Sequence, residues 1–229
     1  MSNILTTHVG SLPRSKELSE FLFAKDKGEK FSQSSFDEVL KNNVESVVKK
    51  QLDVGIDFVS DGEMSKISYA TYIKDRIEGF SGESERRAPA DLDDFPEYKE
   101  KIAKSGGTPT YTRPCCTNEL KVKDEISLQK DINNFKNSLD KLNHRHAFMN
   151  SASPGVINVF MPNKFYSTED EYLDKLSNIM AKEYEVITKS DIQVQLDCPD
   201  LALARHMNFK NLSEDEFIKR AELQIECLN

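Results

Sequence analysis

The sequence lacks any apolar run close to the roughly 18–20 residues that a membrane-spanning helix needs. Its first residues, Met1 to His8, also lack the basic start and apolar stretch of a secretory signal peptide. We therefore expect a protein that does not associate with membranes and resides in the cytoplasm.

Basic residues and paired cysteines are scarce as well. Lys and Arg total 31 against 39 Asp and Glu, so the net charge is −8, whereas a nucleic-acid surface needs a concentrated basic face. The four cysteines form no C-x-x-C pair, which indicates neither a disulfide framework nor a zinc ribbon. A length of 229 residues suits one domain with a substantial core. We expect such a domain, without nucleic-acid binding.

Apolar periodicity predicts helices that alternate with short strands. Helices are expected at 35–54, 66–78, 125–142, 168–189 and 213–228, and strands at 4–10, 56–60, 110–117, 147–151 and 192–196. Capping-box spacing supports the helix starts at Ser35 and Ser213. The polar stretch 81–109 is expected to be an excursion with at most one small helix. This alternation predicts an α/β fold of about five parallel βα units. No Gly-rich phosphate-binding loop follows any of the expected strands, so the usual nucleotide-binding form of such a fold is not indicated.

Small polar and acidic residues follow the expected strands. Function in parallel α/β folds gathers at the carboxyl ends of the strands, so these residues are candidates for one site. They are His8, Gly10, Ser11, Asp61, Glu63, Ser153, Asp197 and Asp200. Capping of the following helix is the simpler explanation for any one aspartate. Carboxylates at several converging positions nevertheless favour a binding site.

Three motifs, in the expected order, resemble a known family. The segments 6–14 (TTHVGSLPR), 55–63 (GIDFVSDGE) and 195–201 (QLDCPDL) are similar to the ends of three strands in the catalytic barrel of cobalamin-independent methionine synthase (5-methyltetrahydropteroyltriglutamate–homocysteine methyltransferase). Together with 152–155 (ASPG), they most resemble short members that consist of the barrel alone. The resemblance implies a (β/α)8 TIM barrel, here incomplete, that forms one partial domain over residues 1–229.

The resemblance also implies a chemistry from methionine biosynthesis. A zinc-bound, homocysteine-like thiolate would take the methyl group of 5-methyltetrahydrofolate. Gly10 and Ser11 would hold the carboxylate of the amino acid, and Glu63 and Asp197 would pair with its ammonium. Further pocket residues would be His8, Arg14, Asp61, Ser153 and Asp200. The sequence departs from the family at Cys198 and Asp200, where the family has Glu and Ala.

The family's zinc ligands are a His-x-Cys pair, a Glu and a Cys that follow later strands, and no His-x-Cys pair occurs in this sequence. We therefore expect a truncated chain that binds no zinc and is inactive alone, although its full-length parent is zinc-dependent. The unpaired edges of an open barrel predict self-association. Two alternatives stay open: a metal-free enzyme like uroporphyrinogen decarboxylase, for which only Arg14 and Arg113 lie near strand ends, and a non-catalytic binding module.

Overall fold

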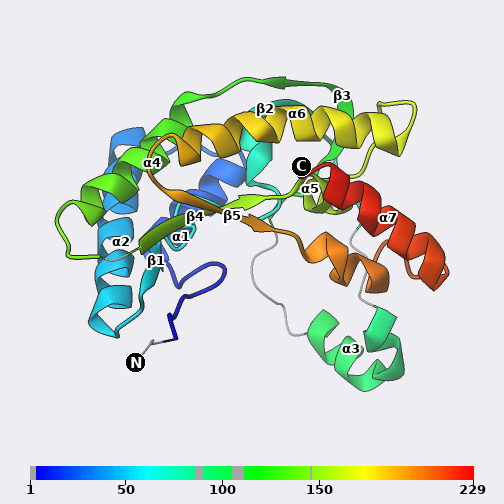
Figure 1. Ribbon diagram of the computed structural model, residues 1–229, viewed down its shortest axis with the longest axis horizontal. Coiled ribbons are helices and arrows are strands. Elements are labelled where there is room, and N and C mark those ends of the chain that lie inside the picture. Colours follow the sequence, from blue (N-terminus) through cyan, green and yellow to red (C-terminus); the bar gives the residue numbers. More distant parts are fainter. Residues whose placement is uncertain (1–3, 86–89, 105–110, 145) are drawn as a thin grey trace.

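A parallel sheet lies at the centre of the computed structural model, which describes residues 4–85, 90–104, 111–144 and 146–229 (Figure 1). Its order is β1 (Phe58–Ser60), β4 (His146–Ala152) and β5 (Gln193–Asp197). Thr7 extends it beside β1 through an isolated parallel bridge to Phe58. The segment expected as a strand over 4–10 therefore contributes a single bridge.

Three long helices cover the sheet. They are α2 (Gln33–Asp53), α4 (Ile126–Leu139) and α6 (Glu169–Thr188), and they confirm the helices predicted at 35–54, 125–142 and 168–189. Apolar side chains of α2, α4 and the end of α6 pack against Val59, Met149 and Val194 in one core cluster, whereas most of α6 contributes to a second cluster. The capping box predicted at Ser35 is wrong, because Ser32 is the N-cap and its hydroxyl accepts from the Ser35 N–H.

An antiparallel pair of strands replaces two of the expected elements. β2 (Ile77–Ser81) pairs with β3 (Cys115–Val122) outside the parallel sheet. The predicted helix 66–78 is wrong: the Ser68 hydroxyl accepts from the N–H groups of Ala70 and Thr71, which favours turns, and only the 3₁₀ helix η1 (Tyr72–Asp75) forms. The strand predicted over 110–117 is confirmed only for Cys115–Thr117, which begin β3, and it is not part of the parallel sheet because β3 pairs antiparallel with β2; residue 110 lies outside the described residues. The described residues thus hold four parallel positions, Thr7, β1, β4 and β5, rather than five.

The remaining helices are short or peripheral. α1 (Lys16–Asp26), which the sequence analysis did not predict, follows the N-cap Ser15. η2 (Ala90–Asp94) and α3 (Pro96–Lys104) lie away from the sheet (Figure 1), within the excursion expected over 81–109, of which 86–89 and 105–109 lie outside the described residues. α5 (Pro154–Phe160), η3 (Pro199–Leu201) and η4 (Leu203–His206) follow β4 and β5.

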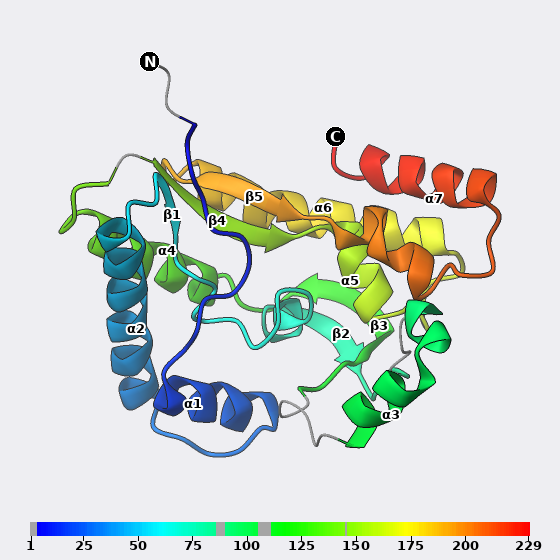
Figure 2. The ribbon, with the colours of Figure 1, turned by 90° about the horizontal axis from the view of Figure 1, so that it is seen from below.

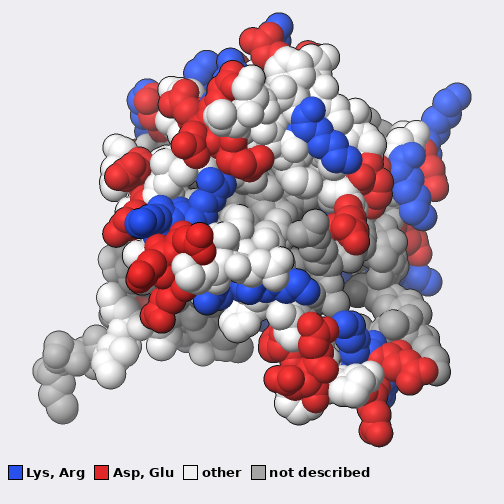
Figure 3. Space-filling view, turned by 90° about the vertical axis from the view of Figure 1, so that its right-hand side faces the viewer, with Lys and Arg blue, Asp and Glu red and all other residues white. Residues whose placement is uncertain are grey.

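The last helix, α7 (Glu214–Glu226), has the capping box predicted at Ser213. In Figure 2, α2 and α7 lie at opposite ends of the sheet, and the parallel sheet does not close into a barrel within the described residues. None of the described helices is long and apolar enough to span a membrane. Acidic and basic side chains are interspersed on the face drawn in Figure 3.

Candidate functional site

The turn after β1 fixes the position of Glu63. Gly62 and Glu63 have φ angles of +64° and +56°, and non-glycine residues rarely adopt such values. The Ser60 hydroxyl accepts from the Gly62 N–H at 3.2 Å, and Asp61 Oδ1 accepts from the Glu63 N–H at 3.0 Å. Asp61 is thus a buried support of the turn. Backbone held in this region often marks a functional site.

Both oxygens of the Glu63 carboxylate accept hydrogen bonds from neutral groups. The Ser11 hydroxyl donates to Oε2 at 2.6 Å, and Asn150 Nδ2 donates to Oε1 at 2.8 Å. Arg14 Nη2 donates to the backbone carbonyls of Glu63 and Lys66 at 2.8 and 2.7 Å. Glu63 is 1% exposed, and its side chain is fixed by partners from two segments, the turn that holds Ser11 and strand β4.

Asp197 ends β5 and is the half-buried acid of the site. Burial and the negative charge of Glu63 raise its pKa to about 6, although Lys66 and a hydrogen bond from the Asn150 side chain act in the opposite direction. The expected pair of Glu63 and Asp197 therefore comes together around Asn150. At neutral pH the pair offers carboxylate oxygens that suit the N–H donors of a cation.

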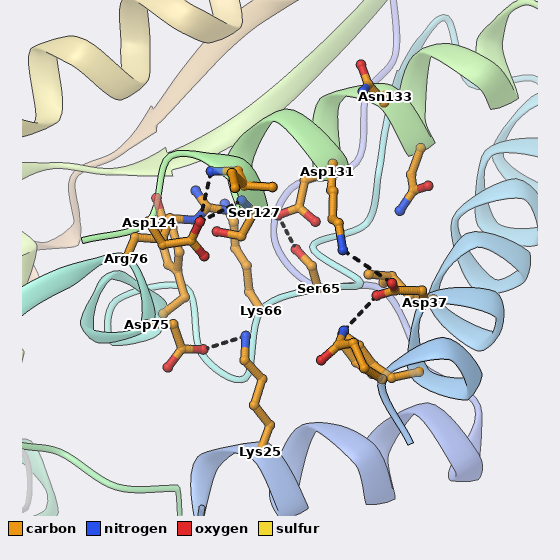
Figure 4. A pocket seen from close by; sticks show the side chains of 17 residues that line it. Lys25, Asp37, Ser65, Lys66, Asp75, Arg76, Asp124, Ser127, Asp131 and Asn133 are labelled. Carbon is orange, nitrogen blue, oxygen red and sulfur yellow. Dashed lines mark hydrogen bonds and ion pairs between the residues drawn. The ribbon is translucent and has the colours of Figure 1, made fainter. Parts of the chain in front are cut away.

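A buried lysine lies close to this pair of acids. Lys66 is 4% exposed, its Nζ donates to the backbone carbonyl of Asn150 at 2.5 Å, and it lies 4.3 Å from the centroid of the Tyr72 ring. Lys66 also lines a cavity of about 500 Å³ together with Arg76 and Asp131 (Figure 4). There Arg76 donates to Asp131 at 2.6 Å and to Glu183 at 2.8 Å.

Asn150 and Lys66 were not among the predicted site residues. Asn150 stood at the expected end of the strand 147–151, which was a usable signal. Lys66 was placed in a predicted helix, and nothing in its sequence neighbourhood distinguishes it from a surface lysine.

The other expected residues are spread around this centre. Gly10 has a φ of +79° and open space at its Cβ position. His8 lines a separate cavity of about 390 Å³ with Arg14 and Asn43. Ser153 and Asp200 bind each other, with 2.7 Å between Oγ and Oδ1, and Ser153 is also the N-cap of α5.

A second cavity, of about 590 Å³, is lined in part by Arg113, Asn158, Phe160, Lys164 and Arg220. The Arg113 guanidinium lies 4.7 Å from the centroid of the Phe160 ring. Tyr69 contacts the same ring edge-on, with 5.6 Å between centroids. Burial raises the Tyr69 pKa to about 12, and the charges of Asp197 and Glu63 contribute. Tyr69 therefore connects the acid pair with this more basic cavity.

Comparison with known proteins finds a similar family. Residues 4–104, which include Ser11 and Glu63, match the family model described as the catalytic domain of cobalamin-independent synthase. A methionine synthase of Sulfolobus acidocaldarius is 26% identical over 195 residues, which cover 85% of this chain and 51% of that protein. The chain is thus similar to the catalytic domain of the cobalamin-independent methionine synthases.

Solved structures of this family share the fold. A B12-independent methionine synthase from Shewanella sp. W3-18-1, in complex with selenomethionine, aligns over 97% of this chain and 57% of its own, with a TM-score of 0.67 and 14% identity. The putative vitamin-B12-independent methionine synthase from Listeria monocytogenes aligns over 86% and 53%, with a TM-score of 0.56 and 14% identity. The chain spans about half the length of these relatives.

The zinc that the family implies has no matching ligand set in the described part of the chain. No group of three or more His, Cys, Asp or Glu side chains there is placed to hold a metal ion. The cysteines Cys115, Cys116, Cys198 and Cys227 are free, but none of them joins such a group. The described residues therefore do not fit a zinc site.

Proposed function

We propose that the site binds a zwitterionic, homocysteine-like amino acid and that it belongs to a methyltransferase that takes the methyl group from 5-methyltetrahydrofolate. The observation that carries this proposal is the pairing of Glu63 with Asp197 around Asn150. Two carboxylates that converge on one place suit a primary ammonium, because its N–H groups can donate to both.

The carboxylate of the same amino acid would lie at the turn after Thr7. Gly10 leaves open space there, and the Ser11 hydroxyl is already donated to Glu63. Backbone N–H groups of Gly10 and Ser11 are therefore the donors that we assign to the carboxylate. The side-chain hydroxyl of Ser11 would orient Glu63 rather than contact the ligand.

The methyl donor would occupy the neighbouring cavity of about 590 Å³. Folates carry carboxylates, and Arg113 and Lys164 supply positive charge on the cavity wall, whereas Arg220 there is paired with Glu169 and Asp170. Phe160 and Tyr69 offer aromatic surface between that cavity and the acid pair. Arg14 is committed to backbone carbonyls, which leaves it less suited to bind a polycarboxylate such as a porphyrin.

We propose further that the chain is part of an incomplete (β/α)8 domain and that these 229 residues do not catalyse methyl transfer by themselves. The proposal is supported by the four parallel strand positions of the described residues and by the lack of a His-x-Cys pair in the sequence. Metal analysis and a methyl-transfer assay test it. Stoichiometric zinc together with turnover would contradict it.

Self-association is the expected consequence of the open sheet. Within the described residues, β5 and the Thr7 segment have no strand on their outer sides, and such edges tend to pair. Sedimentation of the purified chain should give a species larger than a monomer. A compact monomer in solution scattering would count against this proposal.

Calorimetry with L-homocysteine and L-methionine tests the amino-acid site. Glu63→Gln keeps the shape of the side chain but removes its charge, and we expect affinity to fall roughly 30-fold or more, in line with the loss of a buried charge-assisted contact. Glu78→Gln, at an exposed position of β2, is the matched control. Equal affinities for the wild type and Glu63→Gln would reject the proposed site.

A further inference from the structure

Asn150 lies between the two acids of the site. It belongs to β4, the central strand of the parallel sheet, and is 3% exposed. Its Nδ2 donates to Glu63 Oε1 at 2.8 Å, its Oδ1 is buried without a hydrogen-bond partner, and the same side chain lowers the pKa of Asp197. The register pairs Asn150 with Gln195 and Ala152 with Asp197, so Asn150 and Asp197 are diagonal neighbours on one face.

The backbone carbonyl of Asn150 accepts a hydrogen bond from a buried cation. Lys66 Nζ donates to its carbonyl, and the Tyr72 ring lies beneath the same ammonium. Tyr72 is itself fixed, because its hydroxyl donates to Glu183 and exchanges a hydrogen bond with Ser151. Lys66 is therefore committed to the main chain and does not donate a hydrogen bond to either acid in the described contacts.

Two carboxylates at close range repel each other and tend to share a proton. An amide group has two N–H donors, so one asparagine can bind both acids without neutralising either. Arg14 and Lys66 are the cations whose charges act on Asp61, Glu63 and Asp197, and Lys66 also acts on Asp131 and Glu183.

We propose that Asn150, anchored by Lys66, is a positioning residue that holds Glu63 and Asp197 apart as separate acceptors and thereby makes the site specific for a ligand with a single ammonium group. The inference rests on the proposed function and deepens it. Without the amide, the two acids would share a proton and close the space that the ammonium needs.

The titration of Asp197 reports on this arrangement without any ligand. The ionisable groups that face Asp197 are Glu63 and Lys66 after β1, Tyr69 in the following turn, and its neighbour Cys198. Carbon-13 NMR of the Asp197 carboxyl, assigned with Asp197→Asn, should show a midpoint near 6 in the wild type. In Asn150→Leu, which keeps the branched shape of the side chain but removes its donors, we expect the midpoint to rise by about one pH unit.

Ligand binding should follow the same shift. Below pH 6, Asn150→Leu should bind L-methionine about tenfold more weakly than the wild type, and the difference should shrink to about twofold at pH 7 and disappear toward pH 8. Lys66→Met should also raise the Asp197 midpoint, whereas Lys66→Arg should restore it because the charge is kept. Lys74→Met is the matched control: Lys74 is also a mostly buried lysine, but it pairs with Asp26 away from the site.

The outcomes separate the two proposals. A midpoint that is unchanged in both Asn150→Leu and Lys66→Met overturns the positioning role, whatever the binding data show. A shifted midpoint in a chain that binds no methionine at any pH supports the positioning role and rejects the proposed function. If Asn150→Leu does not fold, Asn150→Ser, which has fewer donors, should give a smaller shift in the same direction, and no shift in it overturns the proposal.

Discussion

Two clusters of buried charge lie on either side of Lys66 and differ in how their acids are satisfied. In the closed cluster, Arg76 donates to both Asp131 and Glu183. In the open cluster, Glu63 and Asp197 receive hydrogen bonds from the neutral side chains of Ser11 and Asn150. The same kinds of side chain therefore build an internal ion pair in one place and an acceptor for an outside cation in the other.

The pKa shifts follow this difference for Glu183 and Asp197, whereas burial raises the pKa of Asp131 in the closed cluster in spite of Arg76. Burial would raise the pKa of Glu183, yet the charges of Arg76 and Lys66 hold it below its usual value. Burial also acts on Asp197, but there Glu63 adds to the effect and the pKa rises to about 6. A carboxylate without its own cation is costly to the fold, and such shifted groups are typical of binding sites.

The largest expected effect is the loss of the cation in the closed cluster. Arg76→Met leaves Asp131 and Glu183 buried without their shared partner, and breaking a buried pair in this way typically costs about 3–5 kcal/mol. Urea denaturation, followed by circular dichroism, should show this loss of stability. Lys49→Met, which removes an exposed pair with Asp53, should change stability by about 0.5 kcal/mol or less. Similar values for the two variants would show that the closed cluster does not stabilise the fold.

Removing Asp197 from the open cluster should instead increase the stability of the fold at neutral pH. The pKa of Asp197 is raised in the folded state, so ionisation favours unfolding as the pH rises from about 4 to about 6. Asp197→Asn should therefore match the wild type in stability near pH 4 and exceed it at pH 7.

Ligand affinity provides the second half of this comparison. The wild type should bind L-methionine more tightly as the pH rises through about 6, because Asp197 becomes charged, and Asp197→Asn should lose this dependence together with most of the affinity. Thermal melts and calorimetry over pH 4–8 measure both properties. A variant that is less stable than the wild type at pH 7 would show that Asp197 is a structural residue.

The open cluster was largely predictable from sequence, whereas the closed one was not. Glu63, Asp197 and Ser11 follow strand ends, where parallel folds gather their functional groups. Arg76 lies in the turn between η1 and β2, whereas Asp131 and Glu183 lie on α4 and α6, and no local pattern shows that they meet. The antiparallel pair of β2 and β3 was missed for a related reason: its residues 77–81 were absorbed into a predicted helix and excursion, and strand order is a tertiary property.

Asp200 was expected in the pocket, but its contacts place it with the structural groups. It is 2% exposed and accepts from Ser153. A Cβ added at Gly155 would lie 2.1 Å from its Oδ2, so Asp200 fills the space that this glycine leaves. The residue therefore packs the start of α5 against η3 rather than facing an open cavity.

The smallest expected effect on binding follows from this placement. Asp200→Asn should leave L-methionine affinity within about twofold of the wild type, because Asp200 is held against Ser153 and Gly155. Gly155→Ala should instead lower stability by about 1–3 kcal/mol, the usual cost of overpacking, and combining it with Asp200→Ala should recover part of that loss because the clash is relieved. Calorimetry and denaturation of the three variants measure these effects. A large loss of affinity in Asp200→Asn, with stability unchanged, would show that Asp200 takes part in ligand binding together with Glu63 and Asp197.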